Sequence, residues 1–183
     1  LLEAQNSLLS LYCETLVKVN ISSYLESLNE SCCGLIEKLP DIYTEKDKDR
    51  VNGVLRELTG DLSKLNDYEI ELVQSHGDFQ PANILVDNID QQLYLIDWEY
   101  AAKRSVYYDA LVFASQCRFP QELSVRVRSI LNETNVSWNW CIKNASTKLS
   151  KLELIIFLIE DLIVRLFELQ IPNMINKDFG LDI

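Results

Sequence analysis

The chain has 183 residues, of which 48% are apolar and 25% are charged, and its formal net charge is −11. This composition indicates a globular protein with a buried core and excludes a disordered chain. The negative charge argues against nucleic acid as the main partner, because binding a phosphate backbone requires lysine and arginine. An acidic surface suits a cationic substrate, but it also simply keeps a protein in solution, and both interpretations stay open.

Helical periodicity dominates both ends of the chain. Apolar residues recur there every three or four positions, which predicts helices over residues 1–18, 22–39, 45 to about 60 or 65, 106–117, 120–131 and 147–169. Ser22 or Ser23 is the expected N-cap of the second helix, and Pro40 stops that helix. Pro120 is expected to be the first residue of the fifth helix. The apolar stretch Leu152–Leu169 contains five charged residues, which favours a core helix over a membrane span.

Between these helices the pattern changes to short β-segments. Residues 70–73, 84–86 and 93–96 predict three strands, and residues 87–90 have the composition of a turn. A hairpin that joins the last two strands would return Asp97 close to Asn83. The expected fold class is therefore α+β and mainly helical, with a small β unit in the middle of the chain.

Three polar side chains lie around this β unit. Asp78 and Asn83 are five residues apart on a loop between two strands, and Asp97 follows the next strand. Each residue taken alone is common in ordinary loops. Together they match what phosphoryl transfer requires, which is oxygen ligands for a divalent cation and a carboxylate that orients the acceptor hydroxyl.

The two segments that carry these residues read HGDFQPAN (residues 76–83) and IDWEY (residues 96–100). They resemble the catalytic and metal-binding motifs of the aminoglycoside phosphotransferase and choline kinase superfamily. The resemblance implies the C-terminal catalytic lobe of a kinase-like fold. It also implies that Asp78 is the catalytic base, that Asn83 and Asp97 bind Mg²⁺, and that ATP is the co-substrate.

Four further residues are expected to support this site. His76 either fixes the geometry of the loop by hydrogen bonding, which we favour, or takes part in catalysis. Gln80 and the residues after Asp97 are similar to those of choline and ethanolamine kinases. Glu99 binds the metal or lines the acceptor pocket. Asp109 matches the aspartate with which the family begins the next helix, and we expect it to accept backbone N–H bonds and to brace the catalytic loop.

The acceptor pocket is expected to contain aromatic side chains. An aromatic cage would hold a cationic acceptor through cation–π contacts. The alternative is that these residues pack in the core or lie on the surface. The candidates are Trp138, Trp140 and Tyr100, with Tyr107 and Tyr108 as further contributors.

The chain is predicted to be one lobe, with a helical part over residues 1–66, the catalytic and metal loops over residues 67–117 and a second helical part over residues 118–183. The five glycines form no phosphate-binding cluster, so we expect the N-terminal nucleotide lobe to lie outside this chain, in cis or in a longer gene product. The five cysteines and single histidine do not have the spacing of a zinc site, and they suggest reduced thiols in the cytoplasm.

The predicted function is ATP- and Mg²⁺-dependent phosphorylation of a hydroxyl on a small, cationic molecule such as choline, ethanolamine or an aminoglycoside. We predict no nucleic-acid partner and no membrane span. The alternative is a catalytically silent fragment that serves as a binding or scaffold module. A protein kinase is disfavoured, because Glu99 stands where those enzymes have glycine, and Gln80 where they usually have lysine.

Overall fold

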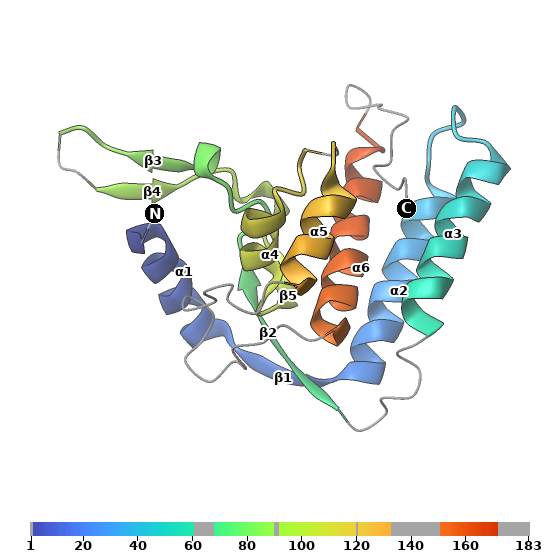
Figure 1. Cartoon of the computed structure of the whole chain (residues 1–183), viewed down its shortest axis with the longest axis horizontal. Helices are drawn as coiled ribbons and strands as arrows, with labels where there is room; N and C mark the ends of the chain where they lie inside the picture. The colour runs from blue at the N-terminus through green and yellow to red at the C-terminus, as the bar shows by residue number, and fades with distance from the viewer. Residues whose placement is uncertain (1, 61–67, 90–91, 120, 133–150, 172–183) are drawn as a thin grey trace. The chain divides into compact units, whose positions relative to one another are not determined.

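A computed structural model describes residues 2–60, 68–89, 92–119, 121–132 and 151–171 (Figure 1). Within these ranges the chain is mainly helical with two small sheets, which confirms the predicted α+β class. The described residues form two compact units. The first unit takes the described residues up to 17 and those from 71 to 132, and the second takes those from 18 to 70 and from 151 to 171. The prediction of a single lobe stays a prediction.

Three helices build the second unit: α2 (Ile21–Glu37), α3 (Glu45–Gly60) and α6 (Lys151–Glu168). They lie side by side in Figure 1, and α2 packs against both α3 and α6. The buried face of α2 follows helical spacing and consists of Ile21, Leu25, Leu28, Cys32 and Ile36. A part-buried polar contact adds to this apolar core, because the hydroxyl of Tyr24 donates to Oε1 of Glu160 at 2.6 Å.

The start of α2 differs from the sequence prediction. Asn20 is the N-cap, and its side-chain oxygen accepts hydrogen bonds from the backbone N–H groups of Ser22 at 2.9 Å and Ser23 at 3.4 Å. The two serines are therefore the capped residues and not the cap. A short strand, β1 (Val17–Asn20), precedes the helix, and the sequence analysis did not predict it.

Strand pairs position the loops of the first unit. Strand β2 (Glu69–Ser75) pairs antiparallel with β5 (Ala102–Ser105), in a register that places Ser75 opposite Ala102. The three-stranded sheet has the order β1-β2-β5. Strand β5 was not predicted. A separate hairpin joins β3 (Ile84–Val86) to β4 (Leu93–Leu95), with Ile84 opposite Leu95.

Three helices complete the first unit: α1 (Leu2–Thr15), α4 (Tyr108–Ser115) and α5 (Leu123–Asn132). The fifth helix was predicted to begin at Pro120, which lies outside the described residues, but it begins at Leu123. The guanidinium of its Arg126 donates to backbone carbonyls of residues 115, 116, 119 and 121, which precede the helix.

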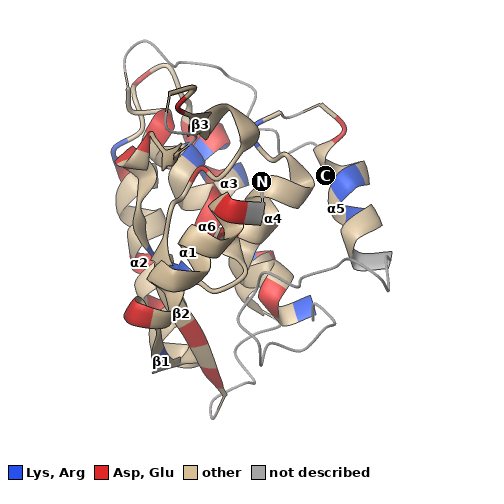
Figure 2. Ribbon diagram, turned by 90° about the vertical axis from the view of Figure 1, so that its left-hand side faces the viewer, with Lys and Arg blue, Asp and Glu red and all other residues tan. Residues whose placement is uncertain are grey.

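The sequence also predicted an acidic chain, no membrane span and reduced thiols. Acidic residues occur on several elements, among them the first turn of α1 and strand β2 (Figure 2). None of the described helices is long and apolar enough to cross a bilayer. Burial, with a smaller contribution from Cys33, raises the pKa of the Cys32 thiol to about 12, so this thiol stays protonated and unreactive near neutral pH. The cytoplasmic location stays a prediction.

Candidate active site

The carboxylate of Asp78 is the centre of a compact hydrogen-bond cluster. Its Oδ2 accepts from the side-chain amides of Gln80 at 2.8 Å and Asn83 at 2.9 Å. Its Oδ1 lies 2.8 Å from Nε of Arg118. The Asp78 and Arg118 side chains are each only 13% exposed. The carboxylate is therefore held in one orientation from both sides, which is what a positioned catalytic group requires.

Asn83 closes the loop that contains Asp78. It belongs to a 3₁₀ turn, η1 (Pro81–Asn83), and its amide N–H₂ donates both to the Asp78 carboxylate and to the Asp78 carbonyl at 2.8 Å. Both donated bonds point back into the loop. The amide oxygen is consequently the atom of Asn83 that is left to bind a cation.

Asp97 is brought to this loop by backbone pairing. The N–H of Ile96 donates to the carbonyl of Asn83 at 3.1 Å. Asp97 directly follows Ile96 in the chain, so this hydrogen bond holds the backbone of Asp97 near Asn83. Asp97 is exposed and has a left-handed backbone, with φ 61° and ψ 55°. This conformation costs about 1 kcal/mol or more for a residue with a side chain, and such costs are concentrated at functional sites.

The donors around this loop fit a magnesium ion that is only partly coordinated by protein. Mg²⁺ usually takes one or two carboxylates and fills its remaining positions with water and phosphate oxygens. Asn83 and Asp97 offer one amide oxygen and one exposed carboxylate. No cluster of three His, Cys, Asp or Glu residues that would suit a fully protein-bound metal occurs in the described part of the chain.

His76 is fully buried, and both of its ring nitrogens are engaged inside the loop. Nε2 lies 2.7 Å from the carbonyl oxygen of Ile96, and Nδ1 accepts from the N–H of Asp78 at 3.3 Å. A carbonyl only accepts hydrogen bonds, so the pattern fits the tautomer with its hydrogen on Nε2. The ring is also 4.5 Å from that of Trp98. These contacts support a role of His76 in fixing the loop conformation, because both ring nitrogens are already hydrogen-bonded to backbone groups and neither is left to contact an acceptor substrate.

Asp109 lies at the start of α4 and is fully buried. Its carboxylate accepts from the backbone N–H groups of His76 at 2.7 Å and Gly77 at 2.9 Å. It also accepts from the hydroxyl of Tyr12 in α1 at 2.6 Å. The backbone donors belong to the loop that leads to Asp78, so this carboxylate joins that loop to two helices of the first unit.

Gly77 occupies a position that only glycine fits. Its φ is +89°, and a Cβ built there would lie 2.2 Å from the carbonyl oxygen of Tyr100. We therefore expect Gly77→Ala to lower the free energy of unfolding of the complete protein by about 2–4 kcal/mol, from steric overlap and from the positive φ. Urea unfolding would measure this change.

Gly53→Ala is the matched control for that variant. Gly53 lies inside α3, where a Cβ meets nothing within 4 Å. Alanine should there raise the free energy of unfolding by about 0.5–1 kcal/mol, because glycine is a poor helix former. A Gly77→Ala protein that is as stable as Gly53→Ala would contradict the close approach of Tyr100.

The remaining predicted residues do not all meet at the site. Glu99 is exposed in the 3₁₀ turn η2 (Trp98–Tyr100), beside Asp97. The ring of Tyr100 lies 5.5 Å from the Arg118 guanidinium carbon. Tyr107 and Tyr108 are 5% and 0% exposed, which favours the alternative that they pack in the core, and their contribution to an acceptor pocket stays a prediction. Trp138 and Trp140 lie outside the described residues.

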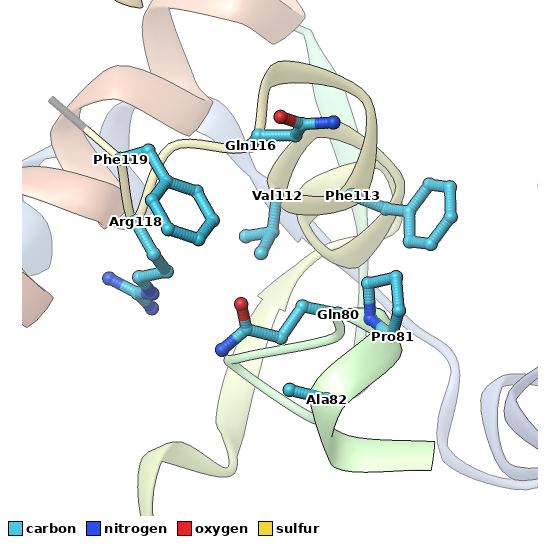
Figure 3. A pocket seen from close by; sticks show the side chains of 8 residues that line it. All are labelled: Gln80, Pro81, Ala82, Val112, Phe113, Gln116, Arg118 and Phe119. Carbon is cyan, nitrogen blue, oxygen red and sulfur yellow. The ribbon is translucent and has the colours of Figure 1, made fainter. Parts of the chain in front are cut away.

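A cavity of about 320 Å³ opens beside the loop that contains Gln80, Pro81 and Ala82 (Figure 3). It lies between η1 on one side and α4 with the turn after it on the other. Its lining consists of Gln80, Pro81, Ala82, Val112, Phe113, Gln116, Arg118 and Phe119. This volume is within the range of small-molecule sites. Two of the lining residues, Gln80 and Arg118, are direct partners of the Asp78 carboxylate.

Sequence reasoning missed Arg118, which contacts the loop, and Tyr12, which contacts the carboxylate that braces the loop. They are 40 residues from Asp78 and 97 residues from Asp109, respectively. No motif includes either of them. One signal was available: a buried carboxylate needs hydrogen-bond donors, so a buried Asp109 predicts a donor side chain beside it.

The choline/ethanolamine kinase family model matches residues 8–119, which is more than half of the chain. The chain belongs to the choline/ethanolamine kinase family. The match covers all of the cluster around Asp78 and the helix that contains Asp109. A search of curated protein sequences found no match to this family member.

Solved structures show the fold of this kinase family member. A structure described as glucosamine kinase in complex with glucosamine, ADP and inorganic phosphate matches it with a TM-score of 0.50 at 14% identity, over 90% of this chain and 46% of that chain. Crystal form A of glucosamine kinase matches with a TM-score of 0.45 at 14% identity, over 90% of this chain and 43% of the other. The match at a TM-score of 0.50 agrees with the fold of a partial kinase-like lobe. The chain spans less than half the length of both of these structures.

Proposed function

We propose that this chain is the catalytic part of a small-molecule kinase that transfers the γ-phosphate of ATP to a hydroxyl group. The observation that carries the proposal is the fixed carboxylate of Asp78, hydrogen-bonded to the amide of Asn83 at 2.9 Å. Two further partners of this carboxylate, Gln80 and Arg118, line a cavity of about 320 Å³. Choline, ethanolamine and aminoglycosides are the first acceptors to test, because the motifs resemble those of kinases for these compounds. The rest of the nucleotide cleft is proposed to come from a lobe outside this chain.

The proposed roles follow from the donors and acceptors at the loop. Asp78 accepts the hydrogen of the acceptor hydroxyl as the phosphoryl group moves. Asn83 and Asp97 hold Mg²⁺, which when bound neutralises charge on the phosphates. His76 and Asp109 position the loop through the bonds described above. Gln80 fixes the second carboxylate oxygen of Asp78 and forms part of the wall of the cavity.

The test is an assay of the complete protein with ATP, Mg²⁺ and a panel of hydroxylated amines, sugars and uncharged alcohols. Phosphorylated product would be detected by ³¹P nuclear magnetic resonance. We expect product only when ATP, Mg²⁺ and a suitable hydroxyl compound are all present. If the folded complete protein phosphorylates no member of the panel, the scaffold function becomes the better interpretation.

The metal assignment has its own test in Asp97→Asn. We expect this variant to need roughly tenfold or more Mg²⁺ for half-maximal rate, since it loses one of two protein ligands.

Glu99→Gln separates the two roles left open for Glu99. A higher Mg²⁺ requirement would make it a metal ligand, whereas a changed KM for the acceptor alone would place it in the acceptor pocket. An unchanged Mg²⁺ requirement in Asp97→Asn would contradict the assignment of Asp97.

A further inference from the structure

Arg104 is a buried cation to which the proposed function gives no role. It lies on β5 and is only 8% exposed. Its Nη1 donates to the hydroxyl oxygen of Ser75 and to the carbonyl oxygen of Tyr100, both at 2.8 Å. Its guanidinium carbon lies 4.6 Å from the centre of the Tyr108 ring. These three partners are all neutral, and a buried cation is costly to keep, so packing alone would be served as well by an apolar residue.

The two hydrogen-bond partners of Arg104 lie where the two loops of the site begin and end. Ser75 is the last residue of β2 and stands just before the loop that contains Asp78. Tyr100 is the last residue of η2, the turn that follows Asp97. A single nitrogen of Arg104 therefore ties the start of one loop to the end of the other.

The position of Asp97 depends on the backbone on either side of it. The side chain of Asp97 is exposed and makes no capping hydrogen bond to η2. On the N-terminal side, the N–H of Ile96 is bonded to the carbonyl of Asn83. On the C-terminal side, the bond from Arg104 holds the carbonyl of Tyr100. Arg104 is thus a C-terminal anchor for the turn that presents the Asp97 carboxylate.

The same carbonyl of Tyr100 also packs against the loop that contains Asp78. It occupies the space that a Cβ on Gly77 would need. A carbonyl that Arg104 holds from one side and that lies against Gly77 has little freedom to move. These two contacts give η2 a defined place beside the loop.

We infer that Arg104 is a positioning residue for the proposed metal ligand Asp97, because it holds η2 against the loop that contains Asp78. The inference rests on the proposed function, since it takes Asp97 as a ligand of Mg²⁺. The guanidinium is assigned no contact with the metal and acts through the carbonyl of Tyr100. Loss of that bond frees the C-terminal side of Asp97, so its carboxylate spends less time beside Asn83 and metal affinity falls.

The first measurement is Mn²⁺ binding to the complete protein without nucleotide, followed through the relaxation of water protons. The chain has a formal net charge of −11, so binding that remains in Asp97→Asn is subtracted as nonspecific. Arg104→Met keeps a long side chain but removes both hydrogen bonds, and we expect it to lower the Asp97-dependent affinity roughly tenfold.

Two other substitutions of Arg104 complete this measurement. Arg104→Lys presents its donors on one nitrogen, as Nη1 does here, and it should restore most of the lost affinity. If Arg104→Met does not fold, Arg104→Gln replaces it. Its neutral amide ends closer to the backbone than Nη1, so the bond to Tyr100 is lost and the same fall in affinity is expected.

Ser75→Ala is the matched control. It removes the other partner of Arg104, together with a hydroxyl that donates to the carbonyl of Ala102 at 3.1 Å, and it keeps the bond to Tyr100. We expect it to lower the free energy of unfolding and to leave the Asp97-dependent Mn²⁺ affinity unchanged. A merely structural Arg104 would give two less stable variants with the affinity of the wild-type protein, and that result would overturn the inference.

Amide hydrogen exchange provides a readout that needs no metal. The N–H of Ala101 donates to the carbonyl of Trp98 at 2.9 Å and closes η2. This N–H should exchange faster in Arg104→Met than in the wild-type protein, whereas the N–H of Ile96 on the other side of Asp97 should keep its protection. Unchanged exchange at Ala101 would show that Arg104 does not hold the turn.

These outcomes also distinguish the inference from the proposed function. A fall in Asp97-dependent affinity in Arg104→Met, in a protein that transfers no phosphate, supports the role of Arg104 and refutes the kinase activity. An unchanged affinity in a protein that does transfer phosphate refutes the role of Arg104 and leaves the kinase activity standing. A wild-type protein without Asp97-dependent Mn²⁺ binding overturns the role of Arg104 and the metal assignment together.

Discussion

Asp78→Asn is expected to lower kcat of the complete protein by roughly 10²–10⁴-fold while leaving nucleotide affinity nearly unchanged. An amide does not take up the proton of an acceptor hydroxyl as a carboxylate does, so the loss falls on the chemical step. The side chain keeps its size, and its carbonyl oxygen still accepts from Nε of Arg118. Its N–H₂, however, faces the amide donors of Gln80 and Asn83, which lose this acceptor.

Gln80→Ala is the control for that local disturbance. It removes one of the two amide donors to Oδ2 and keeps the carboxylate, so we expect a much smaller fall in kcat than in Asp78→Asn. Steady-state kinetics would give kcat and KM, and titration with a fluorescent nucleotide would give nucleotide affinity. If Asp78→Asn kept a kcat near that of Gln80→Ala, Asp78 would be a structural residue and some other group would be the base.

The second large effect is expected for Asp109→Asn, which should lower the free energy of unfolding by about 3 kcal/mol. The buried carboxylate accepts hydrogen bonds from the N–H groups of His76 and Gly77 on different oxygens. Whichever way the new amide turns, its N–H₂ faces one of these backbone donors. A buried N–H that loses its acceptor costs about 1–3 kcal/mol, and the remaining bond loses the strength of a charged acceptor.

Amide hydrogen exchange would locate this effect. In Asp109→Asn the N–H groups of His76 and Gly77 should exchange faster than in the wild-type protein, because they are no longer both bonded in the closed loop. Tyr12→Phe is the control, since it removes only the hydroxyl that donates to the same carboxylate at 2.6 Å. It should cost about 1 kcal/mol and leave both backbone N–H groups protected. Equal exchange in the two variants would contradict the bracing role of Asp109.

The sequence alone predicted the elements whose cause is local. The hairpin of β3 and β4 follows from two short apolar runs around a turn, and the structure pairs Ile84 with Leu95 as such a hairpin requires. Helices α2, α3 and α6 follow from apolar spacing over 16 to 18 residues, a length at which this signal is strong.

The predictions failed where several local signals compete. Asn20, Ser22 and Ser23 are all good N-caps, and only the backbone conformation decides that Asn20 accepts the hydrogen bonds. Proline at residue 120 suggested a helix start, but α5 begins at Leu123, and Arg126 donates to carbonyls in the described turns before it. Strands β1 and β5 have four residues each, too few for alternation to be read with certainty.

What the sequence by itself determined is the family and the spacing of the candidate residues, since Asp78, Asn83 and Asp97 lie within 20 positions on one loop and one hairpin. The tertiary structure decided what surrounds them. Arg118 reaches Asp78 across 40 residues, and Tyr12 reaches Asp109 across 97. Contacts at such separations depend on how α1 and α4 pack against the loop, and the free energy of that packing is spread over many side chains. The surroundings of Asp78 and Asp109 are therefore a property of the fold and are not encoded in any one motif.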